Sequence, residues 1–442
     1  MEIAPPPPVP DPPIGCDPPS LEETRKVVKQ LKGGKAPGVC GIHAELLKAG
    51  GPTVLLHLHA VLCSAWSTGV IPADWRRGLV VPLWKGKGDR LECSNYRAVT
   101  LLSVPGKVFA RVLLERIRHH LLAYQRPEQS GFTPKRSTID RILALRVLIE
   151  RKRDYRQRLV AAYVDLRKAF DSVDRGSLWR VLELRGIPPR LVRLISALYT
   201  DTSSVVRCGG GISDSFPVNS GVRQGCILAP TLFNTCMDWV LGRVAASTDC
   251  GTSFGEVRIT DLDFADDAVI FAETLDALCG TLRLLEKDAG ALGLQVSWIK
   301  TKIQAFGDLL DEAAQTVAIS DGIDVDIVER FTYLGSDIHV SFGSEPEVVR
   351  RLGRACGAMN SLDKGVWRSR YLCRKTKLRV FRALVLPVLL YGCETWTLTK
   401  SLRSRLNAFG TRSLRRILGY RWSDFVSNSA FLRKLGCDRL PA

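Results

Sequence analysis

The spacing of apolar residues divides this chain into segments with helical periodicity and segments with the pattern of strands. A capping box formed by Ser20 and Glu23 marks the start of the first expected helix. Further helices are expected over residues 44–48, 54–68, 107–124, 231–244 and 275–292, and over most of the chain after Glu347. Strands are expected over residues 79–83, 160–164 and 331–335, with two more within 261–271. This mixture of helices and short strands indicates an α+β fold.

Two adjacent acids, Asp266 and Asp267, lie between apolar residues in the segment 261–271, so we expect two strands folded about an Asp-Asp turn. Neighbouring carboxylates repel each other unless cations or hydrogen bonds compensate. Hard divalent cations such as Mg²⁺ bind one or two carboxylates together with substrate phosphates, so the pair suits phosphoryl-transfer chemistry. An ordinary polar turn is the simpler alternative, because Asp favours turns.

A third acid, Asp165, follows the apolar strand 160–164 and precedes a segment that turns into a helix. If this strand end faces the acidic hairpin, Asp165 completes a carboxylate metal site. Farther along, Gly221 and Gly225 lie in the loop that opens the helix 231–244. Glycines there allow the backbone to approach a ligand closely.

The charge of the chain indicates an anionic partner. The net charge is +18 and the pI is about 9.5. Residues 345–442 hold 21 Lys and Arg against 6 Asp and Glu, a net charge of +15. Arg97 beside an apolar strand, with Lys85 and Lys87 on the preceding turn, can clamp phosphates, and a solvated charged loop is the alternative. A charge of this size favours nucleic acid over a membrane surface.

Composition excludes several other classes. Residues 1–19 carry nine of the 23 prolines and are expected to form a disordered, extended tether. The 13 cysteines include no CxxC pair, and the closest two are Cys226 and Cys236, which is not zinc-ligand spacing. We find no targeting signal and no apolar run long enough to span a bilayer. The expectation is an intracellular protein with reduced thiols, in the nucleus or cytoplasm, with no membrane partner.

The order of short motifs resembles the reverse transcriptases of LINE-type (non-LTR) retrotransposons, over about residues 21–428. The matching motifs, in chain order, are Gly34-Lys35-Ala36-Pro37-Gly38, Asn95-Tyr96-Arg97, Gln129-Ser130-Gly131-Phe132, Asp165 through Asp171, Gly221 through Pro230, Phe264 through Asp267, Lys300-Thr301-Lys302, Tyr333-Leu334-Gly335 and Tyr391-Gly392-Cys393-Glu394-Thr395-Trp396. Any one of these motifs is weakly specific, whereas all of them in the family's order are strongly specific.

The resemblance implies a catalytic centre in the middle of the chain. Asp165, Asp266 and Asp267 would form the triad that binds two Mg²⁺ ions, with Mn²⁺ as a possible substitute. Lys300 resembles the lysine that is proposed to protonate the leaving pyrophosphate. Phe170 matches the aromatic steric gate that excludes a ribose 2′-hydroxyl.

The resemblance also implies contacts to nucleotide and primer. Arg97 resembles the residue that contacts the incoming triphosphate, with Lys85 and Lys87 as weaker candidates. Gln224 and Gly225 match the loop that packs under the nascent base pair. Tyr333, Leu334 and Gly335 resemble the primer grip.

The implied fold is a right-hand polymerase of the α+β class. Fingers are expected over residues 20–160, a split βαβ palm with an antiparallel sheet over 161–340, and a basic helical thumb over 341–442. Two positions depart from the family pattern: Cys40 replaces an acid in Pro-Asp-Gly-Ile, and Ala229 replaces the serine of Ser-Pro. The upstream endonuclease of the family is expected to be absent, and no ribonuclease H domain is expected after the thumb.

The function implied is an RNA-directed DNA polymerase that extends a primer 3′-hydroxyl by two-metal nucleotidyl transfer. Its partners would be an RNA template, a DNA primer and dNTPs, and the oligomeric state is left open. One alternative is a decayed retrotransposon remnant that only binds RNA or DNA. A second alternative, an RNA-templated RNA polymerase, is disfavoured because the bulky Phe170 fills the space that a ribonucleotide needs.

Overall fold

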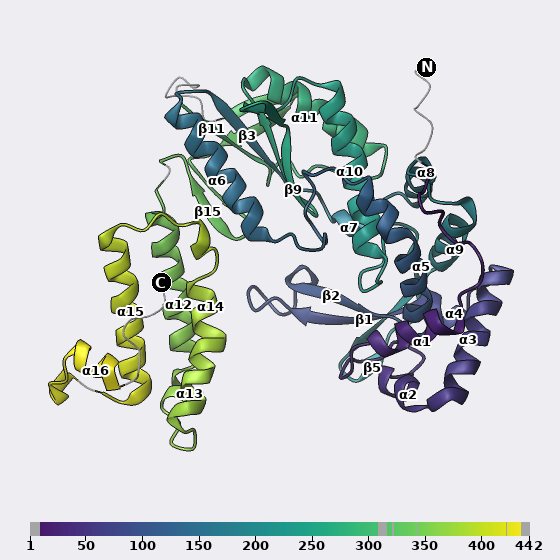
Figure 1. The fold of residues 1–442 in the computed structure, drawn as a ribbon, viewed down its shortest axis with the longest axis horizontal. Coiled ribbons are helices and arrows are strands. Elements are labelled where there is room, and N and C mark those ends of the chain that lie inside the picture. The colour runs from purple at the N-terminus through teal and green to yellow at the C-terminus, as the bar shows by residue number, and fades with distance from the viewer. Residues whose placement is uncertain (1–8, 308–315, 321, 342, 421, 435–442) are drawn as a thin grey trace. The chain divides into compact units, whose positions relative to one another are not determined.

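The computed structural model describes residues 9–307, 316–320, 322–341, 343–420 and 422–434 (Figure 1). The chain divides into two compact units. Unit 1 comprises Met1–Arg136, Ala161–Lys302 and Thr316–Asp326, and unit 2 comprises Ser137–Val160, Ile303–Gln315 and Ile327–Ala442. Each unit is therefore assembled from segments that are far apart in the sequence.

Unit 1 contains most of the helices and strands of the N-terminal three quarters of the chain. Its helices are α1 (Leu21–Gln30), α2 (Ala44–Ala49), α3 (Gly51–Thr68), α4 (Ala73–Arg76), α5 (Val104–Ala123), α7 (Ala169–Ser172), α8 (Arg175–Leu184), α9 (Pro189–Tyr199), α10 (Ala229–Ser247) and α11 (Leu275–Gly290). Its strands are β1 (Arg77–Trp84), β2 (Tyr96–Leu101), β4 (Ser203–Cys208), β5 (Gly211–Ile212), β6 (Phe216–Pro217), β7 (Thr252–Phe254), β8 (Val257–Ile259), β9 (Asp261–Phe264), β10 (Asp267–Ala272) and β12 (Thr316–Ser320). Each of the strands β3 (Leu159–Val164), β11 (Lys302–Phe306) and β13 (Ile323–Ile327) includes residues of both units.

The strands of unit 1 pair mainly in the antiparallel sense. β1 pairs antiparallel with β2 and parallel with β4, and this ribbon projects from the helices around α4 and α5 (Figure 1). In a second sheet β3 lies beside β10, and β10 pairs antiparallel with β9. All six residues of β3 are buried, as expected of a continuous apolar strand inside a sheet. Helix α11 packs on β10, and α10 packs on α11 and α8.

Unit 2 is mostly helical. Its elements are α6 (Thr138–Asp154), β14 (Arg330–Tyr333), β15 (Ser336–His339), α12 (Glu345–Ser361), α13 (Arg374–Val380), α14 (Leu386–Leu389), α15 (Lys400–Leu418) and α16 (Asn428–Lys434). Helices α12, α14 and α15 lie side by side around a core that includes Trp367, Phe381 and Phe409 (Figure 1). The turn before α14, Phe381–Val385, is π-helical.

Most predicted elements occur, and the differences lie at their ends. The strand expected over 331–335 ends at Tyr333, because Leu334 and Gly335 form a two-residue hairpin turn with φ values of 45° and 79°. Asp267 is already part of β10, opposite Phe264, so the acidic turn consists of Ala265 and Asp266 rather than of the two acids. The capping box of Ser20 and Glu23 is present.

The proline-rich segment is held at its carboxyl end. Residues 1–8 of the predicted tether lie outside the described residues. In the described part, Trp66 Nε1 donates to the Cys16 carbonyl at 2.9 Å and Arg116 Nη1 donates to the Asp17 carbonyl at 2.6 Å. This end of the predicted tether is therefore held against α3 and α5 within unit 1.

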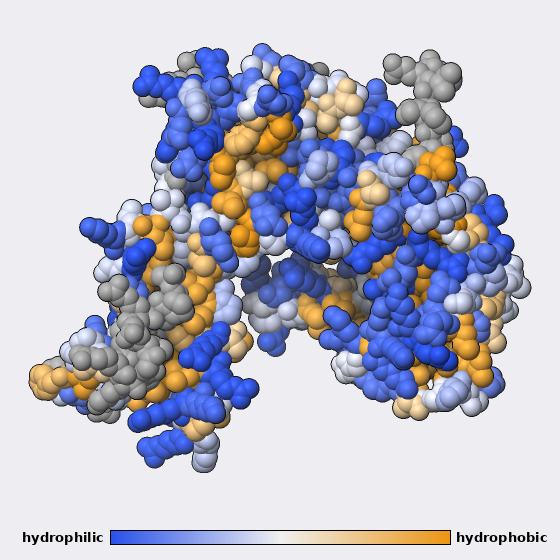
Figure 2. Space-filling view, viewed as in Figure 1, coloured by the Kyte–Doolittle hydropathy of each residue, from blue (hydrophilic) through white to orange (hydrophobic). Residues whose placement is uncertain are grey.

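Hydrophilic residues cover much of the face shown in Figure 2, with apolar groups between them. Among the described residues, no helix is both long enough and apolar enough to cross a membrane.

Candidate active site

The acidic hairpin of unit 1 is built on a two-residue turn. Asp267 of β10 pairs with Phe264 of β9, which leaves Ala265 and Asp266 as the loop. Ala265 has a φ of 61°, a left-handed conformation that two-residue hairpin turns require and that glycine usually supplies. The turn therefore carries backbone strain at the residue next to Asp266, as is common at functional sites.

The carboxyl groups of the hairpin influence one another electrostatically. The side chains of Asp266 and Asp267 are both exposed to solvent. Partial burial raises the pKa of Asp266, and the charge of Asp165 raises it further. The pKa of Asp267 is raised to about 6, first by partial burial and then by repulsion from Asp266 and Asp165. The end of β3 and the turn between β9 and β10 thus bring the three predicted acids into one electrostatic neighbourhood.

Lys300 lies next to Asp165. Its Nζ donates to Asp165 Oδ1 at 3.1 Å, and its side chain remains 65% exposed. The Asp165 backbone is fixed on both sides, because Ser297 N donates to the Asp165 carbonyl at 2.8 Å and Thr301 Oγ1 accepts from Asp165 N at 3.4 Å. The segment 297–301 therefore holds both Asp165 and the lysine that faces it.

These acids have the donor chemistry that a hard divalent cation needs. Within the part of the chain that the structure describes, no set of three or more acid, histidine or cysteine side chains is gathered closely enough to hold a metal ion by itself. Mg²⁺ commonly uses only one or two carboxylates and takes its remaining ligands from substrate phosphates and water. Repulsion among Asp165, Asp266 and Asp267 is what a bound cation would relieve, so the residues fit such a group.

Phe170 and the glycine-containing loop lie next to each other. Val222 N donates to the Phe170 carbonyl at 2.7 Å, and Gln224 Nε2 donates to Asp171 Oδ1 at 3.0 Å. A Cβ atom on Gly225 would lie 2.3 Å from the Thr100 carbonyl oxygen of β2, so only glycine fits there. The structure thus brings the predicted gate and the predicted base-pair loop together.

A hollow of about 450 Å³ lies beside this loop, lined by residues that include Thr100, Asp171 and Gln224. Arg97 belongs to the same β1–β2 ribbon as Thr100, where it pairs with Leu83, and its side chain is exposed. Lys85 Nζ donates to the Ser94 carbonyl at 2.7 Å and so is engaged within the ribbon.

The predicted primer-grip residues belong to unit 2. Tyr333 is buried, and Leu334 and Gly335 form the β14–β15 turn. Tyr391 Oη donates to the Leu334 carbonyl at 2.9 Å, and Arg350 Nη2 donates to the Gly335 carbonyl at 2.5 Å. The turn is therefore held by the Tyr391 motif and by α12.

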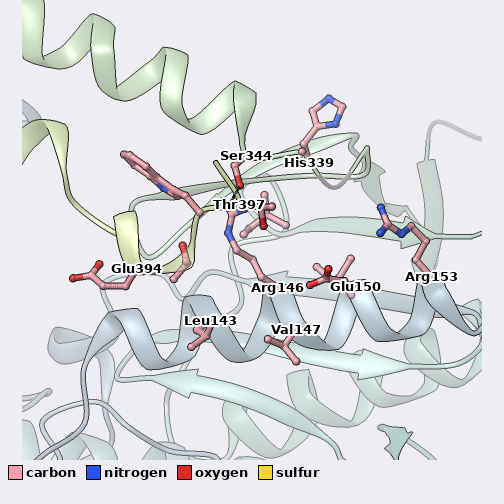
Figure 3. A pocket seen from close by; sticks show the side chains of 14 residues that line it. Leu143, Arg146, Val147, Glu150, Arg153, His339, Ser344, Glu394 and Thr397 are labelled. Atoms are coloured by element: carbon pink, nitrogen blue, oxygen red, sulfur yellow. Dashed lines mark hydrogen bonds between the residues drawn. The ribbon is translucent and has the colours of Figure 1, made fainter. Parts of the chain in front are cut away.

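A second hollow, of about 210 Å³, lies in unit 2 and contains none of the predicted catalytic residues. Figure 3 shows Arg146, Glu150 and Arg153 on α6 along one side of it, with His339 and Ser344 on the other. Its lining mixes both signs of charge, so its chemistry does not select a ligand.

A buried ionic cluster beneath the hairpin has no counterpart in the sequence predictions. Arg126 donates to Asp238, Asp261 and Asp263 at 2.9–3.2 Å, and Arg185 donates to Asp238 at 2.7 Å. Burial raises the pKa of Asp263 well above its usual range, and the neighbouring Asp261 raises it further. The cluster anchors β9 to the segment that precedes the Gln129 motif. Its members come from separate parts of the chain, and no local pattern identifies them.

The two departures from the family pattern also lie in unit 1. Cys40 Sγ donates to Ser103 Oγ at 3.3 Å, close to the half-buried Lys107, whose pKa is lowered by burial. Ala229 is the buried first residue of α10. Neither residue is among the groups that shift the pKa of Asp266 or Asp267.

Acids at the end of a buried strand, facing an acidic hairpin, define a class of site suited to metal-assisted phosphoryl transfer. Residues 85–338 match the family described as reverse transcriptase (RNA-dependent DNA polymerase). The chain belongs to this family, and the α+β fold of the right-hand polymerases expected from the sequence is confirmed.

Several known proteins are similar to the chain. It is 26% identical over 84% of its length to the Retrovirus-related Pol polyprotein from type-1 retrotransposable element R2 of Popillia japonica, covering 51% of that protein. It is 22% identical over 91% of its length to the RNA-directed DNA polymerase from mobile element jockey of Drosophila melanogaster, covering 44%. It is 27% identical over 66% of its length to the Transposon TX1 uncharacterized 149 kDa protein of Xenopus laevis, covering 22%. The chain thus spans from about a fifth to half of these relatives, which confirm the resemblance to LINE-type elements.

Proposed function

We propose that this chain is an RNA-directed DNA polymerase that extends a DNA primer on an RNA template with dNTPs. The observation that carries the proposal is the meeting of Asp165 with Asp266 and Asp267: partial burial raises the pKa values of both hairpin acids, and the charge of Asp165 raises both further. The family, and relatives with the printed name RNA-directed DNA polymerase, support the same activity.

Asp165 and Asp266 would hold two Mg²⁺ ions, with Asp267 assisting. When bound, Mg²⁺ supplies the charge neutralisation that the attacking 3′-oxygen and the leaving pyrophosphate need. Lys300, whose Nζ donates to Asp165 Oδ1, would deliver a proton to the leaving group. Arg97 would bind the triphosphate, and the protein otherwise contributes positioning rather than covalent chemistry.

Primer extension on an RNA template with purified protein and Mg²⁺ tests the proposal. Wild type is expected to add dNTPs, and Asp266→Asn is expected to lose extension by several orders of magnitude while keeping its affinity for RNA, since the change keeps size and removes a metal-binding charge. The exposed Asp214→Asn is the matched control and should behave as wild type.

The alternative of a remnant that only binds nucleic acid has its own signature in this experiment. Tight RNA binding by wild type without extension, in Mg²⁺ or Mn²⁺, would replace the polymerase with that alternative. The double variant Cys40→Asp, Ala229→Ser would then locate the damage. If extension returns in this variant, the damage lies at the two departures, and if it does not return, the damage lies elsewhere.

A further inference from the structure

The turn that carries Asp266 is supported from outside the hairpin by the segment Gln129–Gly131. Ser130 N donates to the Asp263 carbonyl at 2.9 Å, and Asp263 N donates to the Glu128 carbonyl at 3.0 Å, so a single parallel bridge joins the segment to β9. On its other side, Asn234 Nδ2 of α10 donates to the Gly131 carbonyl. The segment is therefore clamped between β9 and α10.

The side chain of Gln129 reaches the turn itself. It is 2% exposed, and its Oε1 accepts from Ala265 N at 3.1 Å and from Gly131 N at 2.7 Å. Two backbone donors fix the orientation of the amide, because a flipped amide would set N–H against N–H. Among the described residues its Nε2 is buried without a partner, which is destabilising, so Gln129 acts through its oxygen.

Ala265 needs such support because its conformation is unfavourable. A φ of 61° is left-handed, and a residue with a Cβ atom adopts it only where its surroundings impose it. Gly131 presses against the same residue: a Cβ on Gly131 would lie 2.1 Å from Ala265 N. Gln129 thus supplies a hydrogen-bond acceptor for Ala265, and Gly131 leaves the space that Ala265 occupies.

We propose that Gln129 is a positioning residue, whose side-chain oxygen holds Ala265 in the left-handed conformation that places the Asp266 carboxylate toward Asp165. The proposal rests on the proposed function, since it assigns Asp266 to the metal site. In this role Gln129 acts on Asp266 through the Ala265 amide.

The test compares Gln129→Met with Gln125→Met. Both variants remove a side-chain amide that makes two hydrogen bonds. The Gln125 Nε2 donates to the Gln129 carbonyl and to Thr133 Oγ1, at 2.8 Å each. Only the Gln129 side chain reaches the hairpin. Gln129→Met is expected to lower kcat for extension about 10- to 100-fold, as misplacing a reacting group by about 1 Å does, with the nucleotide KM nearly unchanged. Gln125→Met should lower the melting temperature about as much as Gln129→Met does, but should lower kcat less than about threefold.

Adding Ala265→Gly to Gln129→Met should recover most of the lost kcat, because glycine adopts the left-handed conformation without support. Equal losses in the two Gln→Met variants, or no recovery in the double variant, would overturn the proposal. Should Gln129→Met fail to fold, Gln129→Glu keeps an acceptor of the same reach and must retain extension for the proposal to stand.

Mn²⁺ binding, followed by electron paramagnetic resonance, separates this proposal from the function on which it rests. A wild type that binds Mn²⁺ but extends no primer would contradict the polymerase alone. Weaker Mn²⁺ binding in Gln129→Met, restored by Ala265→Gly, would still support the positioning role. Absence of Mn²⁺ binding by wild type would overturn both.

Discussion

Phe170 and Phe233 are stacked, with their ring centroids 4.6 Å apart and their planes inclined by 16°. Phe132 packs edge-on with Phe170, with the ring centroids 6.5 Å apart and the planes inclined by 82°. Phe233 is fully buried in α10, so it gives the Phe170 ring a fixed support. The ring proposed to exclude a 2′-hydroxyl is therefore held by packing as well as by its own backbone.

Phe170→Val should admit ribonucleotides while retaining extension with dNTPs. Removing the ring opens space for a 2′-hydroxyl, and we expect discrimination to fall about 10- to 100-fold, in line with other sterically defined pockets. Phe233→Leu keeps an apolar core but removes the stacked ring, so it should lower discrimination between dNTP and rNTP less than Phe170→Val does. The ratio of kcat/KM for dNTP and rNTP measures both effects, and an unchanged ratio in Phe170→Val would refute the gate.

Metal dependence should vary with pH through Asp267. Its pKa of about 6 lies above the usual value of 3.8, so the carboxyl group is largely protonated below pH 6. Because a proton and a cation compete for the carboxylate, the Mg²⁺ concentration for half-maximal extension should rise as pH falls from 8 to 5.5, by at most about tenfold per pH unit below 6. RNA affinity measured over the same range is the control. A constant Mg²⁺ requirement would remove Asp267 from the metal site.

The acidic hairpin could be predicted from sequence because apolar runs on both sides of a polar pair specify strands and turn locally. The register of the hairpin could not be predicted. Asp267 lies in β10 rather than in the turn, because register depends on pairing between two strands, which the sequence of one strand does not encode. Similarly, Leu334 and Gly335 form a turn where the sequence predicts continuing strand.

The supports of the site were beyond sequence analysis for a different reason. The motif that contains Gln129 was recognisable, yet its contact with Ala265 joins positions 136 residues apart. The cluster of Arg126 with Asp238 and Asp263 likewise forms only when β9, α10 and the segment after α5 meet. Such contacts have no local periodicity, so they follow from tertiary structure alone.

Asp263 should make stability fall as pH rises. Its folded-state pKa is raised above the usual 3.8, so between these values the folded chain keeps a proton that the unfolded chain has lost. The slope of the unfolding free energy with pH is then negative, by at most about 1.4 kcal/mol per pH unit from this group. Asp263→Asn, which has no proton to lose, should gain stability relative to wild type as pH rises above the usual aspartate pKa of 3.8. Urea unfolding at several pH values measures this, with the exposed Asp214→Asn as control. Parallel curves for wild type and Asp263→Asn would mean that the buried acid does not hold its proton.

Nucleic-acid affinity should depend on salt through the cations of α13. Arg374, Lys375 and Arg379 are exposed on this helix, where Figure 2 shows hydrophilic side chains projecting from unit 2. Each phosphate contact contributes about −0.7 to −0.9 to the slope of log affinity on log salt concentration. Changing all three to Gln should therefore flatten the slope by about 2 to 3 without loss of melting temperature, because these side chains lie outside the core.

The matched control for this prediction changes cations that already have partners. Arg416 donates to Asp363 and Asn360, and Arg405 donates to Glu345, so their charges are partly neutralised within unit 2. The double variant Arg405→Gln, Arg416→Gln should alter the slope less per charge than the α13 variant. Filter binding to single-stranded RNA between about 50 and 200 mM salt covers the range over which counterion release is linear. A slope unaffected by the α13 variant would show that RNA contacts another surface, and the same measurement on Lys85→Gln, Lys87→Gln would then test the β1–β2 ribbon.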